Sequence, residues 1–172
     1  TAIAGGSSTD KGPTRFGREV IRERNRLKIC TDLSHLNDKS FFAAIEWADY
    51  PIASHSNSRE ICQVPRNLTD EQLRLIGAKN GLIGLCFYPK FLGGNIFEKI
   101  YENICRLGEL GLEDNIAIGS DFDGADMPPE LSDISKVPDL YTYLEKRGIS
   151  AETLKKIFYE NAQNYFDKLS GI

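Results

Sequence analysis

The chain has 172 residues, of which 41% are hydrophobic and 27% are charged, as in an ordinary soluble globular protein. A protein of this length buries roughly 70% of its unfolded surface, so a single domain over residues 1–172 is expected. The formal net charge of −4 leaves no basic surface for a phosphate backbone, which argues against nucleic acid as a partner. No apolar stretch reaches the roughly 18 to 20 residues of a membrane span.

The start of the sequence and its cysteines indicate the compartment. The chain begins without Met, its first 12 residues are too polar for a signal peptide, and the small-residue run 4–9 predicts a loop. The four cysteines form no C-x-x-C pair, which favours free thiols in a reducing compartment over disulfides. We expect a fragment of a cytoplasmic protein. A secreted or membrane-anchored form is the alternative, since a leader or anchor would lie outside these residues.

The apolar pattern predicts an opening helix over 15–27 and then four units in which a short strand precedes a helix. The expected strands are 28–35, 51–55, 81–88 and 115–119, and the expected helices are 38–49, 68–79, 96–110, 139–146 and 150–166. Thr69 and Gln72 form a capping box, so the sequon at Asn67 is interpreted as part of a helix start and not as a glycosylation site. Residues 126–138, with three prolines, predict a loop.

Short apolar strands that alternate with helices predict an α/β fold with a parallel sheet. Two architectures accept this pattern, an open doubly wound sheet and part of a (β/α)8 barrel. No G-x-G-x-x-G motif or P-loop follows the first expected strand, which argues against a nucleotide-binding domain.

The two histidines of the chain are candidate metal ligands. His35 and His55 each end an expected strand, in the similar contexts Leu-Ser-His and Ala-Ser-His. Ligands bind at the carboxyl ends of the strands in both architectures. Two imidazoles from neighbouring strands at that edge are suited to one Zn²⁺. The alternative is a pair of polar residues that cap the following helices and bind no metal.

Three further residues are expected at the same edge. Asp121 follows the fourth strand between glycines and is a candidate ligand or proton carrier, or else part of a turn. Arg66 lies on the loop after the second strand, where its guanidinium could bind a carboxylate or simply be solvated. Tyr88 ends the third strand and is a candidate for the pocket wall. Together these residues favour metal-assisted hydrolysis over hydride or phosphoryl transfer.

Six motifs occur in an order that resembles one known family. They are G-P-T-R-F-G at 12–17, N-R-L followed by D-L-S-H up to His35, A-S-H-S-N from Ala53, P-R-N-L-T-D from Pro65, F-Y-P at 87–89 and G-S-D-F-D-G at 119–124. This order resembles the zinc-dependent membrane dipeptidases, also called renal-type dipeptidases, which are metal-dependent (β/α)8 hydrolases. One local departure is Val64, where the family often has His.

The resemblance implies a role for each matching residue. His35 and His55 would be ligands of one of two zinc ions. Arg66 would bind the terminal carboxylate of a dipeptide substrate, and Asp121 would hold the substrate's amine region and shuttle a proton. Tyr88 is a lesser candidate for the substrate pocket. In the family, a hydroxide shared by the two zinc ions attacks the peptide carbonyl.

The resemblance also implies that part of the enzyme is missing. The family's H-x-D motif, bridging Glu and a further His precede the matched region, and no H-x-D occurs in this chain. We therefore expect the C-terminal half of the barrel, strands five to eight, inactive alone. Its uncovered sheet edges and apolar inner face predict pairing with the N-terminal half or with a second copy as a homo-oligomer. The alternatives are a catalytically incomplete interaction or structural module, and a related hydrolase of lactones or phosphoesters.

Overall fold

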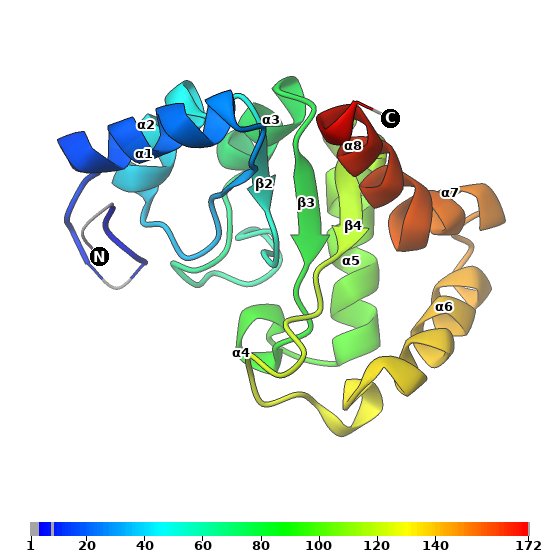
Figure 1. The fold of residues 1–172 in the computed structure, drawn as a ribbon. Helices are drawn as coiled ribbons and strands as arrows, with labels where there is room; N and C mark the ends of the chain where they lie inside the picture. The colour runs from blue at the N-terminus through cyan, green and yellow to red at the C-terminus, as the bar shows by residue number, and fades with distance from the viewer. Residues whose placement is uncertain (1–3, 8, 172) are drawn as a thin grey trace.

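The computed structural model describes residues 4–7 and 9–171 and contains one parallel sheet of four strands. The strands lie in chain order, with each one hydrogen-bonded to the next: β1 (Thr31–Asp32), β2 (Pro51–Ala53), β3 (Leu82–Leu85) and β4 (Ile116–Ile118). Figure 1 shows β2, β3 and β4 side by side with their arrows in one direction. A doubly wound sheet reverses its strand order at a switch point, and these strands do not.

Helices connect the strands as expected for repeated strand-then-helix units. In chain order they are α1 (Arg15–Arg26), α2 (Asp38–Trp47), α3 (Asp70–Ala78), α4 (Pro89–Leu92), α5 (Ile96–Glu109), α6 (Val137–Lys146), α7 (Ala151–Lys155) and α8 (Asn161–Ser170). A π-helical turn, Lys156–Glu160, joins α7 to α8. The predicted capping box is confirmed, since Thr69 Oγ accepts from Gln72 N and the Gln72 side chain accepts from Thr69 N.

The core lies between the sheet and the helices. Its fully buried members come from strands and helices alike, and the largest include Phe41, Leu73, Ile76, Ile83, Leu85, Ile100, Leu107 and Ile116. The nearly continuous apolar run of β3 is buried along its whole length, as expected for a central parallel strand. The four cysteines are free, in agreement with the expectation. None of the helices in the described part of the chain has the length and hydropathy needed to span a bilayer.

Several expected boundaries were wrong. The strands are shorter than the apolar runs, because ladder pairing extends over only two to four residues of each run. The expected loop 126–138 contains two 3₁₀ turns, Pro129–Leu131 and Ile134–Lys136. It also holds the start of α6 at Val137, since Pro138 fits the first turn of a helix. The last helix continues to Ser170, and α4 was not expected.

The expected loop at the start of the chain is confirmed where the structure describes it. Residues 4–7 and 9 form no helix, and Gly6 makes an isolated bridge with Leu36. Residues 1–3 and 8 of the predicted polar start lie outside the described residues.

Candidate active site

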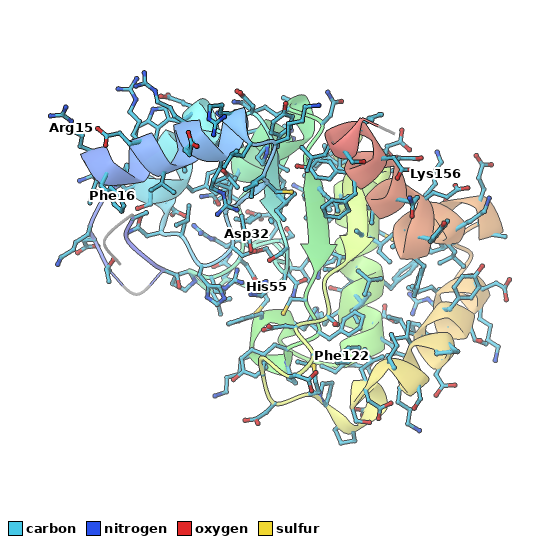
Figure 2. All side chains as sticks on the ribbon, in the orientation of Figure 1. Arg15, Phe16, Asp32, His55, Phe122 and Lys156 are labelled. Carbon is cyan, nitrogen blue, oxygen red and sulfur yellow. The ribbon has the colours of Figure 1, made fainter. Side chains whose placement is uncertain are left out.

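The two histidines lie at corresponding points beyond neighbouring strands. The ladder pairs Asp32 of β1 with Ile52 of β2, and each histidine follows its strand residue by three positions. Parallel strands with this register bring the two side chains to the same edge. His35 Nε2 lies 2.8 Å from His55 Nε2, so both rings direct this nitrogen at one point. Figure 2 shows His55 beyond the arrowhead end of β2.

Asp121 approaches the histidines from the end of β4. Its Oδ1 lies 4.0 Å from His55 Nε2, with both side chains about four-fifths buried. The backbone turns tightly after this residue, since Gly124 N donates to the backbone carbonyl of Asp121 at 3.1 Å. A Cβ at Gly124 would lie only 2.4 Å from Asp121 Oδ1, which explains the glycine. The structure thus brings together the three side chains that the sequence pattern placed at one edge.

The backbone at this edge is unusual. His35 and Asp121 have φ values of 68° and 65°, and Asp123 has 63°, all in the left-handed region. Residues with a Cβ occupy this region at a conformational cost, which is smaller for Asp than for most residues. Such backbone conformations gather at functional sites, where the surrounding structure holds them in place.

Asp32 and Ser54 form a hydrogen-bonded pair on the Nδ1 side of His55. The sequence analysis did not identify either residue. Ser54 Oγ lies 2.7 Å from His55 Nδ1 and donates to Asp32 Oδ2 at 2.5 Å. Asp32 Oδ1 accepts from the backbone N–H groups of Ser34 at 3.0 Å and of Ser54 at 3.1 Å. The available signal was the Asp three residues before the first histidine and the Ser directly before the second.

The electrostatics of the site favour neutral imidazoles and an ionised Asp32. Burial lowers the pKa of His35 and of His55, and the charge of Arg66 lowers both further. Burial of the Asp32 carboxylate raises its pKa, but the hydrogen bonds from Ser54 and Ser34 together lower it more, so the net direction is down. Neutral imidazole is the form that binds a metal ion.

Arg66 is more enclosed than a loop arginine is expected to be. The residue is only 6% exposed, and its guanidinium donates to Ser56 Oγ at 2.9 Å and to the His55 carbonyl at 2.8 Å. Its Cζ lies 5.3 Å from the ring centre of Phe91, a cation–π distance. Arg66 Nε is buried and has no hydrogen-bond partner among the residues that the structure describes. The guanidinium therefore uses only two of its five N–H donors in these bonds.

An open cavity of about 450 Å³ adjoins these residues. It is lined by His35, Tyr88, Phe91, Asp121, Asp123, Gly124, Ala125 and Asp126. Tyr88 thus lies in the wall, as the sequence pattern suggested, and Phe91 of α4 joins it without having been expected. The rings of Tyr88 and Phe91 meet edge to face, 4.8 Å apart.

The residues present fit part of a zinc site. Two imidazole nitrogens and a carboxylate oxygen are the ligand types that Zn²⁺ prefers. Within the described residues, no group of three or more His, Cys, Asp or Glu side chains is placed to hold an ion. Catalytic zinc sites take three protein ligands, so this chain offers an incomplete set.

Comparison with known proteins identifies the relatives. The family model described as membrane dipeptidase, peptidase family M19, matches residues 2–170. An uncharacterized Klebsiella pneumoniae protein from the pqqA 5′ region is 36% identical over 168 residues, which cover 93% of this chain and 62% of that protein. An uncharacterized dipeptidase of Schizosaccharomyces pombe is 34% identical over 167 residues, which cover 93% of this chain and 41% of the relative.

Two solved structures share the fold. The crystal structure of dipeptidase AC, a metallopeptidase of family M19, matches with a TM-score of 0.90 and 34% identity over 98% of this chain and 52% of that one. A Rhodobacter sphaeroides metallopeptidase, solved with a phosphinate mimic of the dipeptide L-Ala-D-Ala, matches with a TM-score of 0.89 and 34% identity over 96% and 49%. The chain thus spans between 41% and 62% of the length of these four proteins. It belongs to the membrane dipeptidase family, peptidase family M19.

Proposed function

We propose that this chain supplies half of the metal and substrate site of a zinc-dependent dipeptidase. The observation that carries the proposal is the convergence of His35 and His55, with Nε2 atoms 2.8 Å apart, beside Asp121 at the carboxyl edge of a parallel sheet. Membership of the dipeptidase family supports the reaction class. The relative solved with a dipeptide mimic supports the substrate class.

The half-site part of the proposal has structural support of its own. The four strands form an open sheet in which β1 and β4 are the edges, and the chain covers about half of the two solved relatives. We place these strands as five to eight of a (β/α)8 barrel within a single domain. Open edges and an incomplete ligand set both favour pairing with an N-terminal half or with a second copy in a homo-oligomer. The free thiols favour a cytoplasmic location over a secreted or anchored one.

Each site residue has a proposed task. His35 and His55 hold one of two zinc ions, which supply an activated water and polarise the peptide carbonyl when bound. Asp121 orients the substrate amine and carries a proton. Arg66 binds the terminal carboxylate through its guanidinium, and Tyr88 lines the pocket. A cavity of about 450 Å³ is of a size for a small ligand such as a dipeptide.

Zinc uptake tests the ligand assignment. The double variant His35→Ala, His55→Ala is expected to lose specific Zn²⁺ binding, measured by competition with a chromophoric chelator and by metal analysis. Asp123→Asn is the matched control, because Asp123 lines the same cavity and also has a left-handed backbone. Among the described residues, the ion pair of His55 is with Asp121 and not with Asp123. Unchanged uptake by the double variant would remove the assignment.

Hydrolysis tests the half-site. Turnover of an Ala-Ala dipeptide is expected to be absent for the chain alone and to return when an N-terminal segment with an H-x-D motif is added. In that complex, Arg66→Lys is expected to raise KM for dipeptides with a free carboxylate more than for their C-terminal amides. Zinc uptake without any return of turnover would favour the second candidate function.

The second candidate function is a non-catalytic interaction module. The observation that favours it is a group of exposed apolar residues near β1, since Leu27, Ile29 and Phe166 are each 45% to 49% exposed. Leu27 and Phe166 line one shared surface hollow together with Leu169. Exposed apolar side chains that gather in this way mark interaction sites.

A further inference from the structure

Asp32, Ser54 and His55 form one line of hydrogen bonds that ends at the point where the two histidines meet. Asp32 Oδ2 lies 2.5 Å from Ser54 Oγ, and Ser54 Oγ lies 2.7 Å from His55 Nδ1. The other oxygen of Asp32 is occupied, because its Oδ1 accepts from Ser34 N and Ser54 N. Three bonds therefore orient this carboxylate, and only its Oδ2 faces the hydroxyl.

We propose that Asp32 and Ser54 are positioning residues that hold His55 as the tautomer with its proton on Nδ1. An ionised carboxylate only accepts hydrogen bonds, so the single proton of Ser54 Oγ points at Asp32. Ser54 Oγ can then only accept from the imidazole, which places the proton on His55 Nδ1. Nε2 is left with a free lone pair that faces His35. The functional meaning of this arrangement rests on the proposed role of His55 as a zinc ligand.

His35 lacks the equivalent support, although it follows the same Ser-His pair. Ser34 Oγ contacts Ser56 Oγ and accepts from the backbone N–H of His55, and makes no bond with the His35 ring. No partner of His35 Nδ1 is found among the described residues. In the metal-free chain, His35 Nε2–H must then be the donor in the contact between the two Nε2 atoms. The two histidines are thus expected to be opposite tautomers.

Ser54 is itself held in place by close packing. A Cβ at Gly84 would lie 2.1 Å from the Ser54 carbonyl oxygen, and a Cβ at Gly119 would lie 1.9 Å from it. The strand end that carries Ser54 and His55 therefore rests directly on the backbones of β3 and of the residue that follows β4. This packing fixes the backbone that carries the Ser54 side chain.

The tautomers can be measured directly, because the chain has only two histidines. Long-range ¹⁵N–¹H correlation spectra of the full chain would be recorded with chelator at about pH 8, above the ordinary histidine pKa. The variant His35→Gln removes one of the two histidine signal patterns and so assigns each pattern to its residue. We expect Nδ1–H for His55 and Nε2–H for His35. A wild-type His55 with its proton on Nε2 would overturn the inference without any further variant.

Asp32→Asn is expected to exchange the donor and acceptor roles along this line of hydrogen bonds. The amide oxygen must keep accepting from Ser34 N and Ser54 N, so the amide nitrogen faces Ser54 Oγ and donates to it. Ser54 then donates to His55 Nδ1, and the imidazole proton moves to Nε2. Ser54→Thr keeps the hydroxyl and should keep the wild-type pattern, and Ser120→Ala at the same edge is the matched control. An unchanged His55 pattern in folded Asp32→Asn would contradict the inference.

Zinc affinity gives the second readout. Asp32→Asn and Ser54→Ala are expected to weaken Zn²⁺ binding about 10- to 100-fold, as loss of a partner behind a metal ligand usually does. Ser54→Thr should restore the affinity. A wild-type chain with His55 protonated on Nδ1 that binds no zinc even with the N-terminal segment added would defeat the proposed function and leave the tautomer inference intact. If the wild-type chain binds zinc and neither variant changes the affinity, the inference about Asp32 and Ser54 is contradicted and the proposed function stands.

Discussion

The two ends of the sheet use polar side chains in different ways. At the amino ends of the strands, side-chain amides close the backbone: Asn115 donates to the Gly81 carbonyl, and Asn161 donates to those of Glu113 and Ile116, each at 2.8 Å. At the carboxyl ends, His35, His55 and Asp121 direct their polar atoms at one another and at an open cavity.

Cavity size does not indicate which end of the sheet holds the candidate site. The larger cavity, about 840 Å³, lies at the amino ends, and the one beside the histidines is about 450 Å³. The larger cavity contains Lys156 and Asp114, which pair with each other at 3.0 Å, and Asn161, whose amide is occupied by backbone. Convergence of partly unpaired groups, and not volume, marks the end that can do chemistry.

The largest expected effect comes from a change at the carboxyl ends of the strands. Gly119→Ala would place a Cβ 1.9 Å from the Ser54 carbonyl and 2.8 Å from Gly84 Cα, in backbone that cannot move aside. We expect a loss of about 3 kcal/mol in unfolding free energy, and weaker zinc binding, because the strand end that carries His55 must shift. Urea unfolding and chelator competition measure the two effects.

Gly108→Ala in α5 is the control for that change. A Cβ there meets only Glu113 Oε1 at an ordinary 3.7 Å. The variant should gain roughly 0.5 to 1 kcal/mol from helix propensity and keep its zinc affinity. If both glycine variants behaved alike, the close packing under Ser54 would not matter.

The next largest effect is a loss of stability at the amino ends of the strands that leaves the histidine site unchanged. Asn161→Ala removes one buried and one partly buried hydrogen bond and leaves the carbonyls of Ile116 and Glu113 without this donor. We expect a loss of about 2 kcal/mol in unfolding free energy at an unchanged zinc affinity. Urea unfolding of the metal-free chain gives the first value. A parallel loss of zinc binding would show that the amino end also shapes the site.

The smallest effect concerns the carboxylate of Asp38 at the start of α2. Hydrogen bonds from Arg59 hold the pKa of Asp38 below its ordinary value of 3.8, and a hydrogen bond from Gln72 adds to this. Asp38 therefore stabilises the fold above about pH 4, and this contribution is lost as the pH falls through the lowered pKa.

Asp38→Asn should therefore cost well under 1 kcal/mol at neutral pH, because the side chain is 51% exposed. The difference from wild type should shrink below about pH 4, as followed by urea unfolding across pH. Glu19→Gln, which removes an exposed pair with Arg15, is the control and should show no such trend. A difference that grows in acid would contradict the assignment.

The alternation of strands and helices was predictable, and the strand ends were not. Apolar runs such as 28–35 show which segments are extended, but the ladder ends where the partner strand ends, which depends on register. Pro89 and Pro138 were interpreted as boundaries, although proline fits the first turn of a helix. The sequence pattern therefore located the units better than their limits.

The same distinction applies to the site. His35, His55 and Asp121 were predictable because each follows a strand, and parallel strands end at one edge. The link from Asp32 through Ser54 was not, since it requires the register that places the Ser54 hydroxyl 2.5 Å from a carboxylate on the neighbouring strand. Burial of Arg66 against Phe91 was also unexpected, because it depends on the short helix α4.

The left-handed backbone at His35 and Asp121 lowers the stability of the fold, while the side chains at these two positions form the candidate site. Glycine would relieve the conformational cost at either position, and would remove an imidazole or a carboxylate from the point of convergence. Selection for heat resistance alone would therefore enrich glycine at positions 35 and 121 and erase the site. An engineer who wants a sturdier protein must leave both positions unchanged and improve the fold elsewhere.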